Sequence, residues 1–163
     1  RLYERKRKKN EYRCKKKKEM NNVFLDANVF LDAILKRTDN YEACQFLLTE
    51  SRNSLLRLKT SPSCLLHVIY FLKKAGIDNS AVIPIMENLL RVVSLASADE
   101  KIFQTALQAG FSDLEDAIQY HTALQVNDID YFITSNIKDY KKALPQLRVI
   151  TPAQFITLYK KKG

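Results

Sequence analysis

Residues 23–30 read Val23-Phe24-Leu25-Asp26-Ala27-Asn28-Val29-Phe30, and this stretch decides the fold. An apolar run ends abruptly at Asp26, and apolar residues then continue with helical spacing at Leu31, Ile34 and Leu35. The pattern predicts a buried strand that leads directly into a helix. A carboxylate at such a junction needs a partner, a metal or hydrogen bonds, and ligands of open α/β sheets bind just beyond the carboxyl ends of the strands. Asp26 is therefore the first candidate for a functional residue.

Short apolar runs and amphipathic segments alternate along the rest of the chain. Strands are predicted at residues 23–25, 55–59, 91–95, 131–134 and 148–150. Helices are predicted between them, with start signals at Asn28, Ser61-Pro62, Ser97, Ser112 and Thr151-Pro152. Because strands alternate with helices, we expect a three-layer α/β/α fold with a central, mainly parallel sheet. Residues 20–163 show no internal repeat and no linker, which predicts a single domain.

Positive charge is concentrated at the beginning of the sequence. The 163 residues carry a formal net charge of +9, and residues 1–19 alone hold eleven Lys or Arg against three Glu. The rest of the chain is therefore close to neutral. We expect residues 1–19 to be a basic, disordered tail outside the domain proper. Two alternatives remain open: an arm that binds nucleic acid through counterion release, and a targeting peptide, although no apolar segment follows the charges.

Cysteine and histidine are too sparse for several classes of site. Cys14, Cys44 and Cys64 lack the paired spacing of a disulfide framework or a zinc site, and they fit a reducing cytoplasm. His67 and His121 are too few and too far apart for a histidine-based metal site. No apolar run approaches the roughly 20 residues of a membrane span. We therefore expect a cytoplasmic protein with no membrane partner.

Acidic and amide side chains recur where the strand-to-helix turns of a parallel sheet would emerge on one edge. These residues are Asp26, Asn28, Asp113, Asp116, Asn136 and Asp139. Oxygen ligands are the ones that Mg²⁺ and Mn²⁺ prefer. Such ions activate water and offset the charge that develops on a phosphoryl group. The sequence therefore predicts a divalent metal site at this edge of the sheet.

Several of the polar side chains near this edge also have a purely structural interpretation. Asn28 can cap the helix that follows Asp26. Asn136 can be an N-cap and Asp139 a first-turn acid stabilised by the helix dipole. Asp32, four residues after Asn28, is expected to be a solvated helix residue.

The helix start near residue 113 is also ambiguous. Glu115 occupies the last position of the capping box Ser112-Asp113-Leu114-Glu115, which predicts a structural role for it. Asp113 lies in the same first turn and is open to either interpretation. Asp116 lies one helical turn after Asp113, on the same face, and capping does not explain it.

Several motifs, taken in order, resemble those of PIN-domain ribonucleases. Leu25-Asp26-Ala27-Asn28-Val29-Phe30-Leu31-Asp32 resembles their opening motif, in which an asparagine orders an aspartate that follows the first strand. The second acidic motif, at a helix start, is similar to Asp113-Leu114-Glu115-Asp116-Ala117-Ile118-Gln119-Tyr120. The third, a strand that ends in Thr, is similar to Tyr131-Phe132-Ile133-Thr134-Ser135-Asn136-Ile137-Lys138-Asp139-Tyr140, and Val149-Ile150-Thr151-Pro152 matches the usual final strand and helix. The resemblance spans residues 20 to about 158, and small single PIN domains of this size are typically VapC-like toxins of toxin–antitoxin pairs.

The chain departs from this family pattern at two positions. With Ser61 aligned to the family's Ser/Thr, His67 stands where the nucleases carry a glutamate. Asn136 stands where the third motif has an aspartate. Two interpretations of His67 remain open. It could bind a metal or carry a proton, or it could be an ordinary polar residue of a helix. Glu115 replaces the missing acid if its side chain turns inward.

The resemblance implies a metal-dependent endoribonuclease acting on RNA. The metal ligands for Mg²⁺ or Mn²⁺ would be Asp26, Asp116 and Asp139, and the catalytic set would be completed by Asn28, Asn136 and Glu115. Three lysines near this edge of the sheet would contact the RNA backbone: Lys36, Lys59 and Lys138. A homodimer and an antitoxin that masks the site are also implied. The alternative is a degenerate PIN domain that binds RNA or a protein partner without cleavage. A nucleotide-binding module is disfavoured, because none of the three glycines lies in a phosphate-loop pattern.

Overall fold

The computed structural model describes residues 21–53 and 56–161. The predicted basic tail over residues 1–19, with Cys14, and the first residue of the strand predicted at 55–59 lie outside the described residues.

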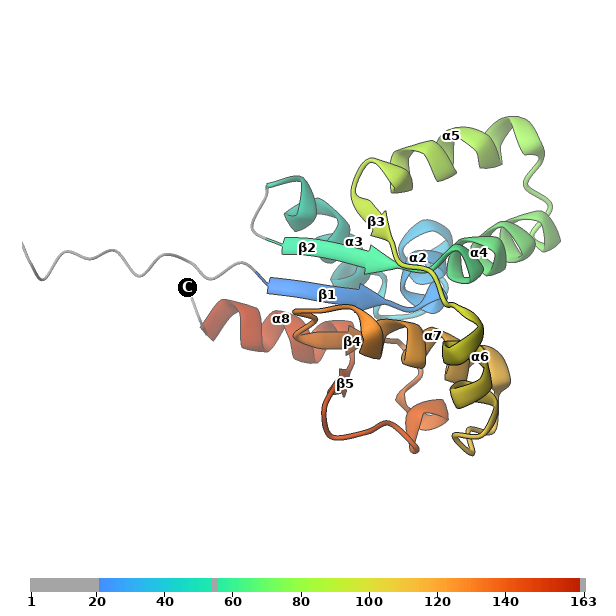
Figure 1. Ribbon diagram of the computed structural model, residues 1–163. Coiled ribbons are helices and arrows are strands. Elements are labelled where there is room, and N and C mark those ends of the chain that lie inside the picture. The colour runs from blue at the N-terminus through green and yellow to red at the C-terminus, as the bar shows by residue number, and fades with distance from the viewer. Residues whose placement is uncertain (1–20, 54–55, 162–163) are drawn as a thin grey trace, which may run out of the picture.

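Five parallel strands form one sheet in the order β3-β2-β1-β4-β5 (Figure 1). They are β1 (Asn21–Leu25), β2 (Leu56–Thr60), β3 (Val93–Leu95), β4 (Tyr131–Ile133) and β5 (Val149–Ile150). The chain first moves from β1 to β2 and β3, and then returns to the other side of β1 for β4 and β5. The strand order therefore reverses at β1, and the loops that leave β1 and β4 border the crevice in which such sheets bind ligands.

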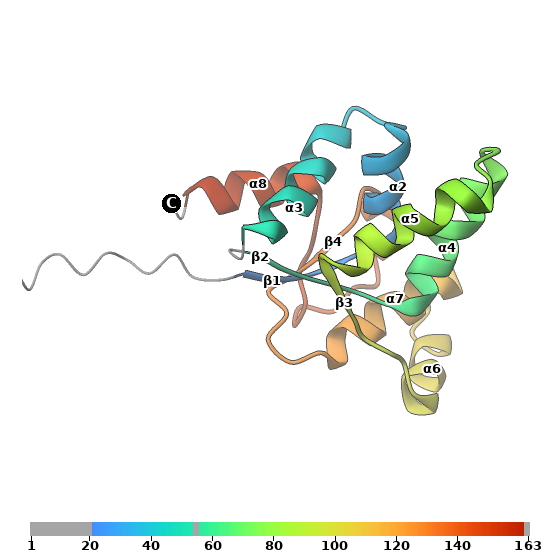
Figure 2. The same ribbon diagram turned by 90° about the horizontal axis from the view of Figure 1, so that it is seen from above.

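Helices cover both faces of this sheet. They are α2 (Ala27–Leu35), α3 (Tyr41–Arg52), α4 (Pro62–Lys74), α5 (Asn79–Leu90), α6 (Glu100–Leu107), α7 (Leu114–Gln125), the short 3₁₀ helix η1 (Ile137–Tyr140) and α8 (Pro152–Lys161). Seen along the sheet, α2, α3, α4, α5 and α8 lie on one side and α6 and α7 on the other (Figure 2). The predicted three-layer α/β/α fold with a parallel sheet is confirmed, and the ends of the predicted strands differ by no more than two residues.

An aromatic cluster joins α7 to the centre of the sheet. Phe24 of β1 and Phe132 of β4 stack with ring centroids 5.5 Å apart, and the Tyr120 ring lies edge-on to Phe132 at 5.6 Å. The Tyr120 hydroxyl donates to the carbonyl oxygen of Leu147 (2.8 Å) and accepts from the Leu144 amide (2.8 Å). A buried tyrosine hydroxyl needs such partners. The cluster fixes the start of α7 relative to the ends of β1 and β4.

Three predicted helix starts were wrong in detail. Asn28 lies inside α2, and the residue before that helix is Asp26, whose side chain makes no capping bond. Asp99 and Asp113, not Ser97 and Ser112, cap α6 and α7. Their carboxylates accept helix amides, and a negative charge at this end of a helix also interacts favourably with its dipole.

Two other predicted starts are confirmed. Ser61 caps α4 by accepting from the Cys64 amide, with Pro62 at the first helical position. At α8, the Gln154 amide donates to the Thr151 hydroxyl and the Thr151 amide donates to the Gln154 side chain, which is the reciprocal pattern of a capping box.

Two further findings concern the length of the helices and the state of the cysteines. Among the described residues, no helix is long and apolar enough to cross a bilayer. Cys44 and Cys64 are buried and carry free thiols. Burial raises the pKa of both thiols to about 12, so they remain protonated.

Candidate active site

Asp26 is held at the end of β1 by groups from the end of β4 and from α2. Its side chain is buried, with 1 % exposure, and its backbone amide donates to the carbonyl oxygen of Ile133 (3.0 Å). The Oδ2 atom accepts from the Thr134 hydroxyl (2.7 Å) and from the Asn28 side-chain amide (3.2 Å). Burial raises the pKa of Asp26, and these two hydrogen bonds oppose the rise. Asn28 thus contacts Asp26 through its side-chain amide and does not cap the helix.

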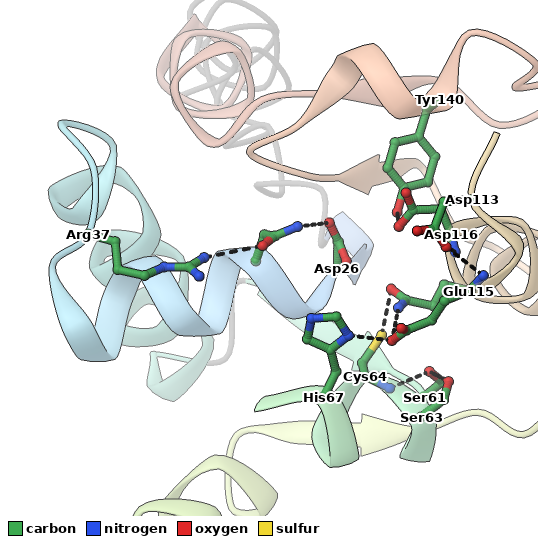
Figure 3. A network of polar contacts seen from close by, with 12 residues as sticks. Asp26, Arg37, Ser61, Ser63, Cys64, His67, Asp113, Glu115, Asp116 and Tyr140 are labelled. Atoms are coloured by element: carbon green, nitrogen blue, oxygen red, sulfur yellow. Dashed lines mark hydrogen bonds and ion pairs between the residues drawn. The ribbon is translucent and has the colours of Figure 1, made fainter. Parts of the chain in front are cut away.

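The other end of the Asn28 side chain contacts an ion pair within the same segment. The Asn28 Oδ1 accepts from Nη2 of Arg37 (3.2 Å), and in Figure 3 the labelled Arg37 side chain extends toward Asp26. Nε of Arg37 also donates to Oδ1 of Asp32 (3.1 Å). Asp32 is only 1 % exposed, so the expectation of a solvated residue was wrong. Lys36 ends α2 in the left-handed conformation (φ 50°), and the chain after it returns Arg37 toward the helix.

Asp116 lies in the first turn of α7, within electrostatic reach of Asp26. Its Oδ1 accepts from the Tyr140 hydroxyl (3.0 Å), and its backbone amide donates to the capping carboxylate of Asp113 (3.3 Å). Burial, together with the negative charges of Asp26, Asp113 and Asp139, raises the pKa of Asp116 to about 7, against the lowering effect of the Tyr140 hydrogen bond. The structure therefore gathers acids from three separate segments around Asp116.

The raised pKa of Asp116 predicts that metal-free protein loses stability as pH rises. Between about pH 4 and pH 7 the folded state binds more protons than the unfolded state, so the free energy of unfolding falls across this window. We expect Asp116 to contribute about 1–2 kcal/mol to the fall, because solvent screening at this half-buried side chain reduces the effect. Urea unfolding in EDTA at pH 4.5 and pH 7.5, compared between the wild type and Asp116→Asn, measures it. A pH dependence unchanged by Asp116→Asn would contradict the assignment.

Glu115 and His67 form a second polar group beside the two buried acids. Oε1 of Glu115 lies 2.5 Å from Nδ1 of His67 and accepts from the Gln119 side-chain amide (3.2 Å). The Cys64 thiol donates to the other end of Gln119 (2.9 Å). The His67 ring also stacks on Phe71, with centroids 4.7 Å apart. Glu115 therefore links α7 to α4, and its predicted capping role was wrong.

Asn136 and Asp139 pair with each other at the start of η1. The Asn136 side-chain amide donates to Oδ2 of Asp139, and the Asn136 backbone amide donates to the Thr134 hydroxyl (3.0 Å). Thr134 thus connects Asn136 to Asp26. Asp139 adds negative charge around Asp116 without a direct hydrogen bond to it among the described residues.

Similarity to known proteins identifies the family of this chain. The family model for the PIN domain matches residues 22–138, well over half of the chain. This chain belongs to the PIN-domain family. A search of functionally curated proteins finds no match.

Solved structures give a consistent result at the level of the fold. A chain in the crystal structure of VapBC2 from Rickettsia felis, bound to a DNA fragment from their promoter, superposes on this PIN domain with a TM-score of 0.58 at 19 % sequence identity. The match covers 80 % of the present chain and 98 % of the Rickettsia chain. The resemblance to VapC-like PIN domains that the motifs implied is therefore confirmed for the fold.

The donor set of this PIN domain suits a hard divalent cation only in part. Within the described residues, no group of three or more His, Cys, Asp or Glu side chains is arranged to hold a metal. Asp26 and Asp116 are nevertheless close enough for their charges to interact, and neither forms an ion pair with a described Lys, Arg or His. Mg²⁺ is usually held by one or two carboxylates together with water. The chemistry of these two donors fits such an ion, whereas Asp139 is already paired with Asn136.

Sequence reasoning missed two hydrogen-bonding partners of the central acids, Thr134 for Asp26 and Tyr140 for Asp116. Thr134 follows Ile133, which pairs with Leu25 in the parallel register, so Asp26 and Thr134 must lie side by side once β1 and β4 are neighbours. The motif at residues 131–140 contained that signal. Tyr140 is one helical turn beyond Asn136, and its contact with Asp116 depends on how η1 lies against α7, which no local pattern specifies.

Proposed function

We propose that this protein is a metal-dependent endoribonuclease of the PIN type and the toxin of a toxin–antitoxin pair. The observation that supports this most is the pair formed by buried Asp26 and half-buried Asp116 at the switch point of the sheet. Within the part of the chain that the structure describes, the side chains that donate hydrogen bonds to these carboxylates are all neutral: Thr134, Asn28 and Tyr140. A divalent cation would compensate the negative charges that these two carboxylates carry when both are ionised, and burial and mutual repulsion oppose that ionisation in the metal-free protein.

The proposed reaction divides roles among the side chains of this edge. When bound, Mg²⁺ or Mn²⁺ supplies Lewis-acid chemistry at an RNA phosphodiester. Asp26 and Asp116 would hold the ion, and Asp139 would be a third ligand. The positioning residues would be Asn28 for Asp26 and Asn136 for Asp139. Glu115, paired with His67, lies beside this set and would handle a proton or orient water.

Removal of divalent metal is expected to abolish cleavage. The full chain incubated with structured RNA should cut it in Mn²⁺ or Mg²⁺, lose all cutting in excess EDTA, and recover it when the ion is restored. Denaturing gels of the products measure this. Equal cutting with and without EDTA would exclude the metal-dependent mechanism.

A degenerate PIN domain that binds RNA or a protein without cleavage is the second candidate. The contact between Asn136 and Asp139, and that between His67 and Glu115, favour it, because both acids already have partners. RNA binding by gel shift with no cleavage in Mg²⁺ or Mn²⁺ would support this candidate over the first.

We also infer a homodimer, an antitoxin partner and a cytoplasmic location. Large apolar side chains are exposed on the adjacent helices α4 and α5: Leu66 (66 %), Tyr70 (61 %) and Ile83 (57 %). Exposed apolar surface of this kind supports a protein interface. Light scattering of the purified chain measures the dimer, and co-purification with the product of a neighbouring small reading frame tests the antitoxin. The free, buried thiols of Cys44 and Cys64 support a reducing compartment.

A further inference from the structure

The two halves of one sheet face differ sharply in what covers them. On the side of α7, the face carries the buried Phe24 and Phe132. Toward β3 it carries polar residues instead, because the parallel register pairs Asn22 with Arg57 and Lys59 with Ser94. Figure 1 shows α6 and α7 on the β4 side of the molecule, away from β3. Among the described residues, no helix therefore covers the β2–β3 half of this face.

A recess of about 1140 Å³ lies on this open half and is strongly basic. It extends from the sheet to the ends of α3 and α5 and to the loop before β4. Its cations are Arg52, Arg57, Lys59 and Arg91, and its amide side chains are Asn22, Asn88 and Asn127. Among the residues that line it, the single acid is Asp128.

The four cations of this recess are available to a ligand. Within the described part of the chain, none of them forms an ion pair, since the recorded pairs are Arg37 with Asp32 and His67 with Glu115. Ser51 and Ser94 also line the recess, but their hydroxyls already donate to backbone carbonyls. Because the chain beyond residue 19 is nearly neutral, four unpaired cations in one concavity create a local positive field.

We propose that this basic recess binds the sugar–phosphate backbone of RNA outside the metal site. Phosphate oxygens are contacted in proteins mainly by Arg and Lys, together with Asn and other polar donors, which is the composition found here. Lys59 lies near the carboxyl end of β2, directly before the Thr60-Ser61 turn into α4, so the recess begins close to the edge that carries Asp26. An extended polyanion suits it better than a small phosphate compound, because four cations line a single recess of about 1140 Å³.

This inference rests on the proposed function only in taking RNA as the ligand. The test therefore measures binding in EDTA, where cleavage does not contribute. Fluorescence anisotropy of a labelled single-stranded RNA would compare the full-length wild type, the Arg57→Ala/Arg91→Ala variant and a matched control, Lys73→Ala/Lys101→Ala. The control removes two exposed charges from α4 and α6. Residues 1–19 are present in all three proteins, so their contribution is the same.

The recess variant is expected to bind RNA about tenfold more weakly than the control, and the slope of log affinity against log salt should fall by about 1.4. Arg57→Lys/Arg91→Lys should restore most of the affinity, and circular dichroism should show the same fold in every variant. Equal affinity and equal salt slope for recess variant and control would overturn the proposal. An acidic peptide serves as a second probe. If the recess variant loses affinity for this peptide while its affinity for RNA is unchanged, the proposal is overturned in favour of a protein ligand. If the wild type binds through the recess and never cleaves, the proposed ribonuclease fails while the recess stands.

Discussion

Replacing Asp26 or Asp116 with asparagine is expected to lower RNA cleavage in Mn²⁺ or Mg²⁺ at least about a hundredfold, because each change removes a charged metal ligand from the proposed site. Asparagine preserves the size of the side chain and one oxygen. Asp26→Asn can also retain the bonds to Thr134 and Asn28. Initial rates of RNA cleavage under saturating metal, with Mn²⁺ affinity measured separately by electron paramagnetic resonance, quantify the loss.

Asp113→Asn is the matched control for both changes. Asp113 is exposed, lies in the same turn as Asp116 and caps α7 through Oδ1, a role that asparagine also performs. It should retain cleavage within a few fold of the wild type. Equal cleavage by the wild type and by all three variants would identify a contaminating nuclease. A hundredfold loss in Asp113→Asn alone would place the metal elsewhere in the α7 turn.

Arg37→Ala is expected to destabilise the fold by about 2–4 kcal/mol, because it leaves the buried carboxylate of Asp32 without its cation. Within the described residues, Oδ2 of Asp32 already has no hydrogen-bond partner, so Arg37 is the main compensation for this charge. The same change frees the Asn28 amide and should lower cleavage by about 10–100-fold, as is typical for a residue that orients a metal ligand. Urea unfolding at pH 7.5 and cleavage rates measure the two effects.

Two further variants separate the stability effect from the positioning effect. Arg37→Lys keeps a positive charge near Asp32 but lacks the fork that reaches both Asp32 and Asn28, so it should regain stability more than cleavage. Asp32→Asn in the Arg37→Ala background should recover part of the lost stability, since no buried charge remains. Arg148→Ala, an exposed arginine without a described ion pair, should stay within about 0.5 kcal/mol of the wild type. Full cleavage by Arg37→Ala protein that remains folded would rule out the positioning role.

Most of the fold could be predicted because its signals are local. The apolar run before Asp26, the Ser61-Pro62 start and the Thr151–Gln154 capping box each depend on neighbouring residues, and the structure contains all three elements. Helix starts at Ser97 and Ser112 were misplaced by two and one residues, since each segment offers a serine and an aspartate as candidate caps. Such competition is decided by the packing of the whole helix.

The acids of the site were visible in the sequence, but apart from Asn28 beside Asp26 their partners were not. Asp26 and Asp116 stood out because each lies at a strand or helix end beside apolar residues. Asp32 looked like an ordinary helix acid, yet α2 is buried on nearly all sides and Arg37 folds back on it. Glu115 matched a capping box but contacts His67, 48 residues earlier in the chain, on another helix.

By itself, the sequence determined the elements of this protein and the edge at which its acids lie, because periodicity, caps and the ends of apolar runs depend on near neighbours. Only the tertiary structure decided which partner each carboxylate has. Asp26 and Asp116 lie close enough for their charges to interact. The other acids have different partners: Asp139 contacts Asn136, Glu115 contacts His67 and Asp32 contacts Arg37. The physical reason is that a carboxylate's burial and pairing depend on residues from distant segments, which meet only when the strands assemble around β1.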